Sequence, residues 1–216
     1  MAGALMPGAR LVLASGNRAK LAELQALLAP VGRVLQAQSD LGIDEAAEPH
    51  PSFVENALAK ARHAAAASGL AAIADDSGLC VQALGGAPGV ASARYAPPVA
   101  AGGDRESRRR LQDAANNRLL LERMLGCSDR RAAFVATLVA VRHAADPEPL
   151  IAVGRWEGRI LEAPRGEGGF GYDPLVFVVA LGKSVAELAA DEKNAFSHRA
   201  LAAREMLAVM RARWPR

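Results

Sequence analysis

The sequence is poor in cysteine, in aromatic residues and in long apolar runs, and each scarcity excludes a class of protein. Only two of the 216 residues are cysteines, Cys80 and Cys127, and they lie far apart without the spacing of a metal-ligand pair. We interpret both as small buried residues of a protein that works in a reducing compartment. No apolar run approaches the ~20 residues that a membrane-spanning helix needs. The first ten residues lack the basic start and long apolar stretch of a secretory signal, so we expect a cytoplasmic protein.

The excess of positive charge is also small. With 26 basic and 23 acidic residues, the formal net charge is +3. Aromatic residues make up only 4% of the chain, so the stacking platforms of single-strand-binding proteins are largely missing. We interpret the consecutive Arg108, Arg109 and Arg110 as the solvated face of a helix rather than a track for phosphates. The sequence therefore predicts no nucleic-acid partner.

Lysine is the rarest basic residue. Of the 26 basic residues only four are lysines, namely Lys20, Lys60, Lys183 and Lys193. In a chain that nearly always uses arginine, a lysine indicates a place where a compact ammonium group is needed. Three of the four lie in the motifs described below.

Short apolar segments alternate with helical patterns, which predicts an α/β fold with a mixed sheet. We expect strands at residues 10–15, 34–37, 71–74, 79–84, 132–141, 150–156, 158–161 and 175–179. Helices are expected after Asn17, Ser52, Asp104, Ser184 and Ser197, with Asp104 as a candidate N-cap. Ser52 and Ser184 each precede a glutamate by three residues, the pattern of a capping box. We expect one domain over residues 1–216.

The segment LVLASGNRAKLAE at residues 11–23 predicts a strand, a turn and a helix. Gly16 allows the backbone to approach an anion, and the N–H groups at the start of the following helix point toward it. Lys20, one turn into the helix, adds a positive charge. The Walker pattern of P-loop proteins is absent. An ordinary strand-to-helix turn explains the segment equally well.

Asp75-Asp76-Ser77-Gly78 lies between two apolar segments, and we expect a turn there. Carboxylates at the end of a buried strand cost stability unless a cation or hydrogen bonds compensate them. One interpretation is a Mg²⁺ site with Glu48 as second ligand, and the other is an acidic turn capped by its own backbone. If the strand continues, the side chains of Asp75 and Asp76 point to opposite faces of the sheet, and only one of them lies at the site of the reaction. Whether Asp75 joins the metal site stays open.

Two further motifs suggest recognition of a flat ligand. In Gly168-Gly169-Phe170-Gly171-Tyr172-Asp173, the glycines permit close approach and the rings offer stacking faces, although a hairpin loop with packed aromatics is an alternative. Lys193 and Ser197-His198-Arg199 place polar groups near a helix start. A histidine there is usually a surface or capping residue, but beside Arg199 it is a candidate for reading a ring that carries a carbonyl.

Together these motifs resemble the inosine triphosphate pyrophosphatase family, also called Ham1-like. The resemblance runs from Leu11 to about Leu207. It is carried by SGNRAK at 15–20, SFVENALAKARHA at 52–64, ADDSGL at 74–79, LGGAPGVASARYA at 84–96, GGFGYDP at 168–174 and EKNAFSHR at 192–199. Ser15 stands where many members have threonine, which keeps the hydroxyl. Residues 97–131 and those around Glu48 match less clearly.

The resemblance implies an elongated mixed sheet with two lobes and a nucleotide cleft between them, a homodimer and a requirement for Mg²⁺. Asp76 would be the general base and a metal ligand, and Glu48 the second metal ligand. Ser15, Gly16, Asn17 and Lys20 would hold the triphosphate, assisted by Lys60 and Arg94, with Ser77 a further substrate contact. Phe170, Gly171, Tyr172, Asp173, Lys193, His198 and Arg199 would form the base pocket.

The implied activity is hydrolysis of dITP, ITP and XTP to the monophosphate and pyrophosphate, with water attacking the α-phosphorus. A Maf-like pyrophosphatase that acts on pyrimidine or modified nucleotides is the alternative enzyme. A nucleotide-binding regulator without hydrolysis is an alternative of another class, against which the presence of both Asp76 and Lys20 argues. A nucleic-acid-binding module comes third.

Overall fold

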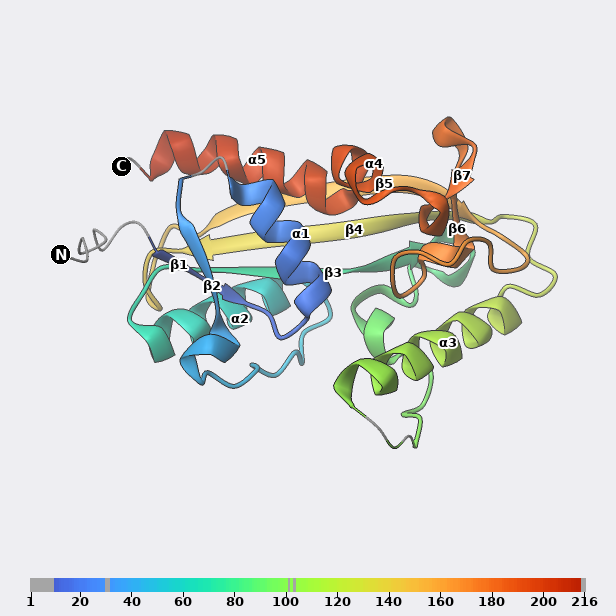
Figure 1. The fold of residues 1–216 in the computed structure, drawn as a ribbon, viewed down its shortest axis with the longest axis horizontal. Helices are drawn as coiled ribbons and strands as arrows, with labels where there is room; N and C mark the ends of the chain where they lie inside the picture. The colour runs from blue at the N-terminus through green and yellow to red at the C-terminus, as the bar shows by residue number, and fades with distance from the viewer. Residues whose placement is uncertain (1–9, 30–31, 101, 103, 215–216) are drawn as a thin grey trace. The chain divides into compact units, whose positions relative to one another are not determined.

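A computed structural model describes residues 10–29, 32–100, 102 and 104–214. Within these residues seven strands form one sheet in the order β2-β1-β3-β4-β5-β6-β7 (Figure 1). The strands are β1 (Arg10–Ala14), β2 (Val34–Ala37), β3 (Ala72–Val81), β4 (Arg131–Val141), β5 (Leu150–Ile160), β6 (Val176–Val178) and β7 (Lys183–Ser184). β1 pairs in parallel with β2 and β3, whereas β6 pairs antiparallel with β5 and β7. The predicted α/β class and mixed sheet are confirmed.

The helices are α1 (Arg18–Leu28), α2 (Phe53–Ser68), α3 (Arg105–Arg123), α4 (Ala190–Phe196) and α5 (His198–Arg213), with short 3₁₀ turns between them. The predicted caps are confirmed at two starts: Ser52 accepts a hydrogen bond from the Glu55 N–H, and Asp104 accepts one from the Ser107 N–H. The Ser184 capping box is present, but the turn that it begins, Val185–Glu187, is a 3₁₀ turn and not an α-helix.

The chain divides into two compact units. Unit 1 comprises the chain up to Asp76, Ala136–Gly154 and the chain from His198 onward. Unit 2 comprises Ser77–Val135 and Arg155–Ser197. β3, β4 and β5 contribute residues to both units. The expectation of one two-lobed domain with a cleft stays a prediction.

Unit 1 covers both faces of its strands with helices, which explains why these strands are apolar throughout. In β1, Leu11 and Leu13 pack in a cluster with residues of α1 and α5. The alternate residues Val12 and Ala14 pack on the opposite face with the alanines of α2. Since side chains in a strand alternate between faces, an unbroken apolar strand indicates two covered faces.

One glycine in unit 1 permits a close approach between a strand and a helix. A Cβ on Gly154 in β5 would overlap the carbonyl oxygen of His198 and approach the backbone nitrogen of Ala202, both in α5. Nearby, the N–H of Val153 donates a 3.0 Å hydrogen bond to the carboxylate of Glu205 in the same helix. These contacts hold the first turns of α5, which carry His198 and Arg199, against β5.

Unit 2 has its own core. Leu79 and Val81 of β3 pack with Leu120 of α3 and Trp156 of β5. The remaining members include Leu175, Val176 and Val185. Tyr172 belongs to the same cluster, so the segment around it and α3 are parts of one packed body.

The structure corrects three expectations drawn from local patterns. β3 runs unbroken from Ala72 to Val81 through the four residues predicted to turn, and β5 joins the two strands predicted at 150–156 and 158–161. β3 lies between β1 and β4 in the sheet, and β5 lies between β4 and β6, so polar residues within these strands do not end them. Cys80 and Cys127 are half-buried rather than buried. Among the described residues, no helix is long and apolar enough to cross a membrane.

Candidate functional site

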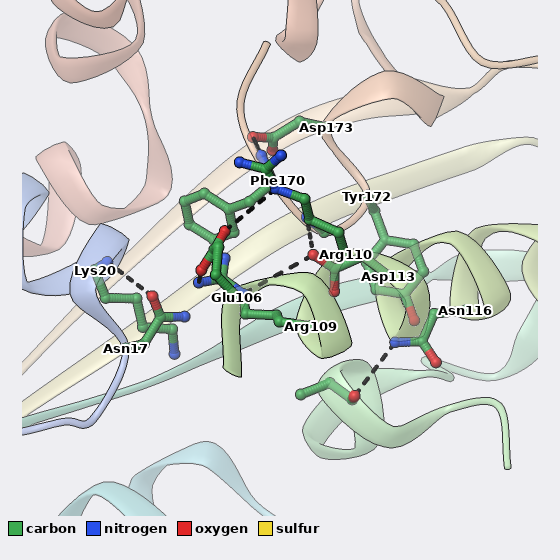
Figure 2. A network of polar contacts seen from close by, with 12 residues as sticks. Asn17, Lys20, Glu106, Arg109, Arg110, Asp113, Asn116, Phe170, Tyr172 and Asp173 are labelled. Carbon is green, nitrogen blue, oxygen red and sulfur yellow. Dashed lines mark hydrogen bonds and ion pairs between the residues drawn. The ribbon is translucent and has the colours of Figure 1, made fainter. Parts of the chain in front are cut away.

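The turn between β1 and α1 is closed by its own side chains. The N–H of Asn17 donates to the Ser15 hydroxyl at 3.2 Å, and the Asn17 side-chain carbonyl accepts from the Lys20 N–H at 3.2 Å (Figure 2). Asn17 thus caps the helix on which Lys20 lies. The predicted turn at Ser15, Gly16 and Asn17 is confirmed as a strand-to-helix connection, and its role as a phosphate holder stays a prediction.

Asp75 lies at the centre of an ion network on one face of β3. Its side chain has no exposed surface, and its Oδ2 lies 2.9 Å from the Lys20 ammonium and 3.5 Å from Nε of Arg199. Arg199 also lies 3.0 Å from the carboxylate of Glu23. Burial alone would raise the pKa of Asp75, but Lys20 and Arg199 outweigh it and hold that pKa well below its usual value. Burial lowers the pKa of Lys20, and Asp75 opposes that shift.

Asp76 belongs to a second network. The Lys60 ammonium on α2 lies 3.2 Å from Oδ1 of Asp76 and 2.5 Å from Oε1 of Glu48. Burial raises the pKa of Asp76 and the Glu48 charge adds to the rise, while Lys60 opposes it. Asp76 Oδ2 is buried and has no hydrogen-bond partner among the described residues.

The two carboxylates point to opposite faces, as expected for a continuing strand. Ile73, two residues before Asp75, packs in the cluster of α1 and α5, and Asp75 pairs with Lys20 and Arg199 of those helices. Ala74, two residues before Asp76, packs with α2, and Asp76 pairs with Lys60 of that helix. Each buried carboxylate therefore has a cation, which offsets the cost of placing it inside a strand.

Glu48 and Asp76 could together hold a divalent cation. No group of three or more histidine, cysteine, aspartate or glutamate side chains suited to a metal occurs in the described part of the chain. Mg²⁺ usually takes one or two protein carboxylates and completes its shell with water and phosphate oxygens. Two carboxylates around one ammonium group, together with the unpaired Asp76 Oδ2, fit that pattern. Asp75 pairs with Lys20 and Arg199 on the opposite face of β3, so it does not belong to this pair of carboxylates.

A residue that sequence reasoning did not assign, Asn56, fixes the loop that carries Glu48. Its side chain is fully buried on α2, accepts from the His50 N–H at 3.0 Å and donates to the His50 carbonyl at 3.1 Å. Both backbone groups of a residue two positions after Glu48 are thereby held. In the sequence, only its position pointed to this residue: Asn56 lies four residues before Lys60, so both are on one face of the same helix.

In unit 2, Asp173 organises the 170–173 loop. Its Oδ2 accepts from the Phe170 N–H at 2.9 Å and lies 2.8 Å from the buried Lys193 ammonium. Lys193 Nζ lies 4.5 Å from the centroid of the Phe170 ring. Gly169 has a φ of +73°, and a Cβ there would overlap the Asp173 carboxylate. The structure thus brings Phe170, Asp173 and Lys193 together. Their role in a base pocket stays a prediction.

Tyr172 and Arg109 also contribute to this region (Figure 2). The Tyr172 hydroxyl donates to the Ser92 carbonyl at 2.9 Å, and burial raises the pKa of that hydroxyl. The guanidinium carbon of Arg109 lies 4.9 Å from the centroid of the Phe170 ring. The interpretation of all three consecutive arginines as solvated is therefore wrong for Arg109, because an aromatic ring lies within reach of that helix face.

The remaining predicted residues are divided between the units. Ser77 is half-buried at the start of unit 2, and Arg94 is exposed at the end of the 3₁₀ turn Gly89–Arg94. His198 and Arg199 are buried at the start of α5 in unit 1, whereas Phe170 and Lys193 belong to unit 2. The assembly of all these side chains around one base stays a prediction.

Comparisons with known proteins agree along nearly the whole chain. The family model described as Ham1 family matches residues 11–209. A protein from Methylibium petroleiphilum named dITP/XTP pyrophosphatase is 68% identical over 205 residues, covering 95% of this chain and 99% of that protein. The structure of a HAM1 protein from Coxiella burnetii matches with a TM-score of 0.84 and 42% identity, covering 94% of this chain and 98% of that one. The Ham1 protein of Staphylococcus aureus matches with a TM-score of 0.79 and 34% identity over the same shares.

Proposed function

We propose, because this chain belongs to the Ham1 family, that it hydrolyses the deaminated purine nucleoside triphosphates dITP, ITP and XTP to the monophosphate and pyrophosphate. One observation in the structure carries the proposal: adjacent buried carboxylates, Asp75 and Asp76, each face a lysine from a different helix. Lys20 lies in the first turn of α1, directly after a strand-to-helix turn suited to an anion. Lys60 bridges Asp76 to Glu48. Paired ammonium and carboxylate groups of this kind suit a polyanionic substrate attacked by water.

Asp76 is the general base in this proposal. Its Oδ2 is buried and has no hydrogen-bond partner in the described chain, so it can accept a proton from a water molecule directed at the α-phosphorus. The P–O bond to the pyrophosphate breaks as the water oxygen bonds to phosphorus. Lys20 and Lys60 can donate to phosphate oxygens and stabilise the charge that builds on the leaving pyrophosphate.

We further propose that the reaction requires Mg²⁺, held by Asp76 and Glu48. When bound, the ion would neutralise charge on the phosphate oxygens and make the phosphorus more electrophilic. In the structure Lys60 neutralises the same two carboxylates. Its long flexible side chain can turn from the carboxylates to a phosphate when a cation takes over that charge.

On the base side, we propose that Phe170 stacks on the purine and that Lys193, His198 and Arg199 read its edge. Lysine and arginine only donate hydrogen bonds, so they pair with the 6-carbonyl of hypoxanthine or xanthine. The 6-amino group of adenine is also a donor and would leave these groups unpaired. A site that pairs with its substrate in this way can discriminate by roughly 10⁴-fold.

The family resemblance also leads us to propose that the protein is a homodimer and acts in the cytoplasm. We propose that it binds the nucleoside triphosphate substrate and binds neither nucleic acid nor a membrane. Sedimentation or light scattering on the purified protein tests the dimer. A monomer at micromolar concentration would contradict it.

A nucleotide panel tests the activity. Purified protein is incubated with dITP, ITP, XTP, dATP, dGTP, dTTP or UTP, with Mg²⁺ or with EDTA, and monophosphate and pyrophosphate are measured. We expect release from dITP, ITP and XTP with Mg²⁺ only. Hydrolysis confined to dTTP and UTP would favour the Maf-like alternative. Binding of dITP without any pyrophosphate release would indicate a regulator and overturn the proposal.

A further inference from the structure

The middle of the 170–173 loop is held by a helix more than fifty residues earlier in the chain. The N–H of Gly171 donates to Oδ2 of Asp113 at 2.9 Å, and the Gly171 carbonyl accepts from Nδ2 of Asn117 at 3.0 Å. Asp113 and Asn117 lie four residues apart on α3, so they share one face of that helix. Both backbone polar groups of one glycine are therefore paired with side chains of a single rigid element.

This pairing fixes the two peptide planes that flank Gly171. Its N–H belongs to the peptide that follows Phe170, and its carbonyl belongs to the peptide that precedes Tyr172. With both planes held, the backbone at Phe170 has little freedom to rotate, and the direction in which the ring leaves the chain is set. Gly171 itself has a φ of +63°, a conformation that is open to glycine but gives no rigidity by itself.

The space beside Gly171 remains open although its polar groups are paired. A Cβ built on Gly171 meets no atom within 4 Å. The loop is thus supported from the α3 side and leaves room at the glycine Cα for a flat ligand. The two residues after Gly171 have separate supports, since Asp173 pairs with Lys193 and Tyr172 bonds to Ser92.

The same stripe of α3 reaches the Phe170 ring. Arg109, one turn before Asp113, has its Nε 4.0 Å from Oδ2 of Asp113 and its guanidinium carbon 4.9 Å from the ring centroid (Figure 2). Glu106 faces Arg109 from the preceding turn at 3.7 Å. Support for Gly171 and contact with the ring of Phe170 therefore come from consecutive turns of one helix.

We propose that Asp113 and Asn117 are positioning residues that set the Phe170 ring for stacking on the base and so determine selectivity among purines. The inference rests on the proposed function, because it needs a base at Phe170. The residues assigned to phosphates, except Arg94 and Ser77, belong to unit 1, whereas Asp113 and Asn117 belong to unit 2. Their loss is therefore expected to weaken recognition of the base and to leave recognition of the triphosphate unchanged.

The test compares Asp113→Ala, Asp113→Asn and Asn117→Ala with the unaltered protein. Asp113→Asn retains a carbonyl that can accept from the Gly171 N–H, so it is the rescue variant. Gln112→Ala is the matched control. Gln112 adjoins Asp113 and bonds to the backbone of Ala96 and Val99, but not to the 170–173 loop.

For each protein, kcat and KM are measured with dITP and dATP, inhibition by inorganic tripolyphosphate reports the phosphate site, and Tm reports stability. For Asp113→Ala and Asn117→Ala we expect kcat/KM for dITP to fall about tenfold, mainly through KM. The dITP-to-dATP ratio should fall with it, while inhibition by tripolyphosphate is unchanged. Asp113→Asn should recover most of the loss, and Gln112→Ala should lower Tm without changing the ratio.

Three outcomes decide the matter. An unchanged dITP-to-dATP ratio in Asp113→Ala and Asn117→Ala overturns the positioning role alone, as does an equal weakening of tripolyphosphate inhibition. If Asp113→Ala does not fold, Asn117→Ala carries the same comparison. Absence of dITP hydrolysis by the unaltered protein overturns the proposed function and this inference with it.

Discussion

The Lys20 ammonium lies 2.9 Å from Oδ2 of Asp75, a carboxylate with no exposed surface, and Arg199 approaches the same oxygen. Asp75 thereby holds the lysine of the proposed phosphate turn and the arginine of the proposed base pocket. Its partner on the strand, Asp76, is left to face Lys60. Two adjacent aspartates therefore have different partners, because successive side chains of a strand point to opposite faces and so to different helices.

The first prediction concerns Asp75. Asp75→Ala leaves the half-buried Lys20 and the buried Arg199 without their shared carboxylate, and breaking a buried pair typically costs about 3–5 kcal/mol of folding free energy. Urea denaturation measures the loss. Asp129→Ala is the control, because Asp129 pairs at 2.7 Å with the exposed Arg131, and loss of such a surface pair lowers stability much less than loss of a buried pair. Equal losses in the two variants would show that the Asp75 network contributes no more than a surface pair.

The second prediction concerns Asp76. Asp76→Asn keeps the size of the side chain but cannot take the proton of the attacking water, so kcat for dITP should fall by at least about 10²-fold. Binding of dITP, measured by calorimetry, should be largely retained because Lys20 and Lys60 are still present. A variant with near-normal turnover would exclude Asp76 as the general base.

The third prediction follows from the two hydrogen bonds between Asn56 and the backbone of His50. Asn56→Ala frees the loop that carries Glu48, so a higher Mg²⁺ concentration should be needed for half-maximal activity. His63→Ala serves as the control. It removes a contact at 3.0 Å from the same helix to the carbonyl of Asp44 in the same loop, without touching His50. If both variants show the Mg²⁺ dependence of the unaltered protein, Glu48 is not a ligand positioned by Asn56.

What the sequence predicts correctly here depends on neighbours along the chain. The caps at Ser52 and Asp104 are local patterns, and so is the glycine turn before α1, and each is found where expected. The unbroken β3 could not be predicted from the strand's own residues, because the cations that compensate Asp75 and Asp76 come from three helices, α1, α2 and α5. The sequence around Asp75 and Asp76 shows that burying the two carboxylates would cost stability, but it does not show the cations that offset this cost.

The same limit explains the residues that were missed. Asn56, Asp113 and Asn117 look like ordinary polar residues of helices, and their significance lies in the loops that they hold. Asn117 and Gly171 are 54 positions apart. Only the fold identifies which polar side chain meets which backbone group over such a separation.

The last prediction concerns pH and Asp146 in unit 1. Its fully buried carboxylate accepts from the N–H and the guanidinium of Arg142 and from the N–H of Glu148, at 2.7–3.0 Å. The hydrogen bonds from Arg142 outweigh burial and hold the pKa of Asp146 well below its usual value. A depressed pKa in the folded state means that these contacts stabilise the fold above the unfolded pKa of about 3.9. This stabilisation is lost as the pH falls toward the folded pKa.

The Tm of Asp146→Asn should therefore lie below that of the unaltered protein at pH 7, and the gap should narrow as the pH is lowered below about 4. Asp44→Asn, at an exposed carboxylate, is the control and should follow the unaltered protein at every pH. Thermal denaturation across this range measures both differences. A gap that stays constant from pH 7 to 3 would mean that Asp146 acts through shape and hydrogen bonding alone, since its protonation would then be the same in the folded and unfolded chain.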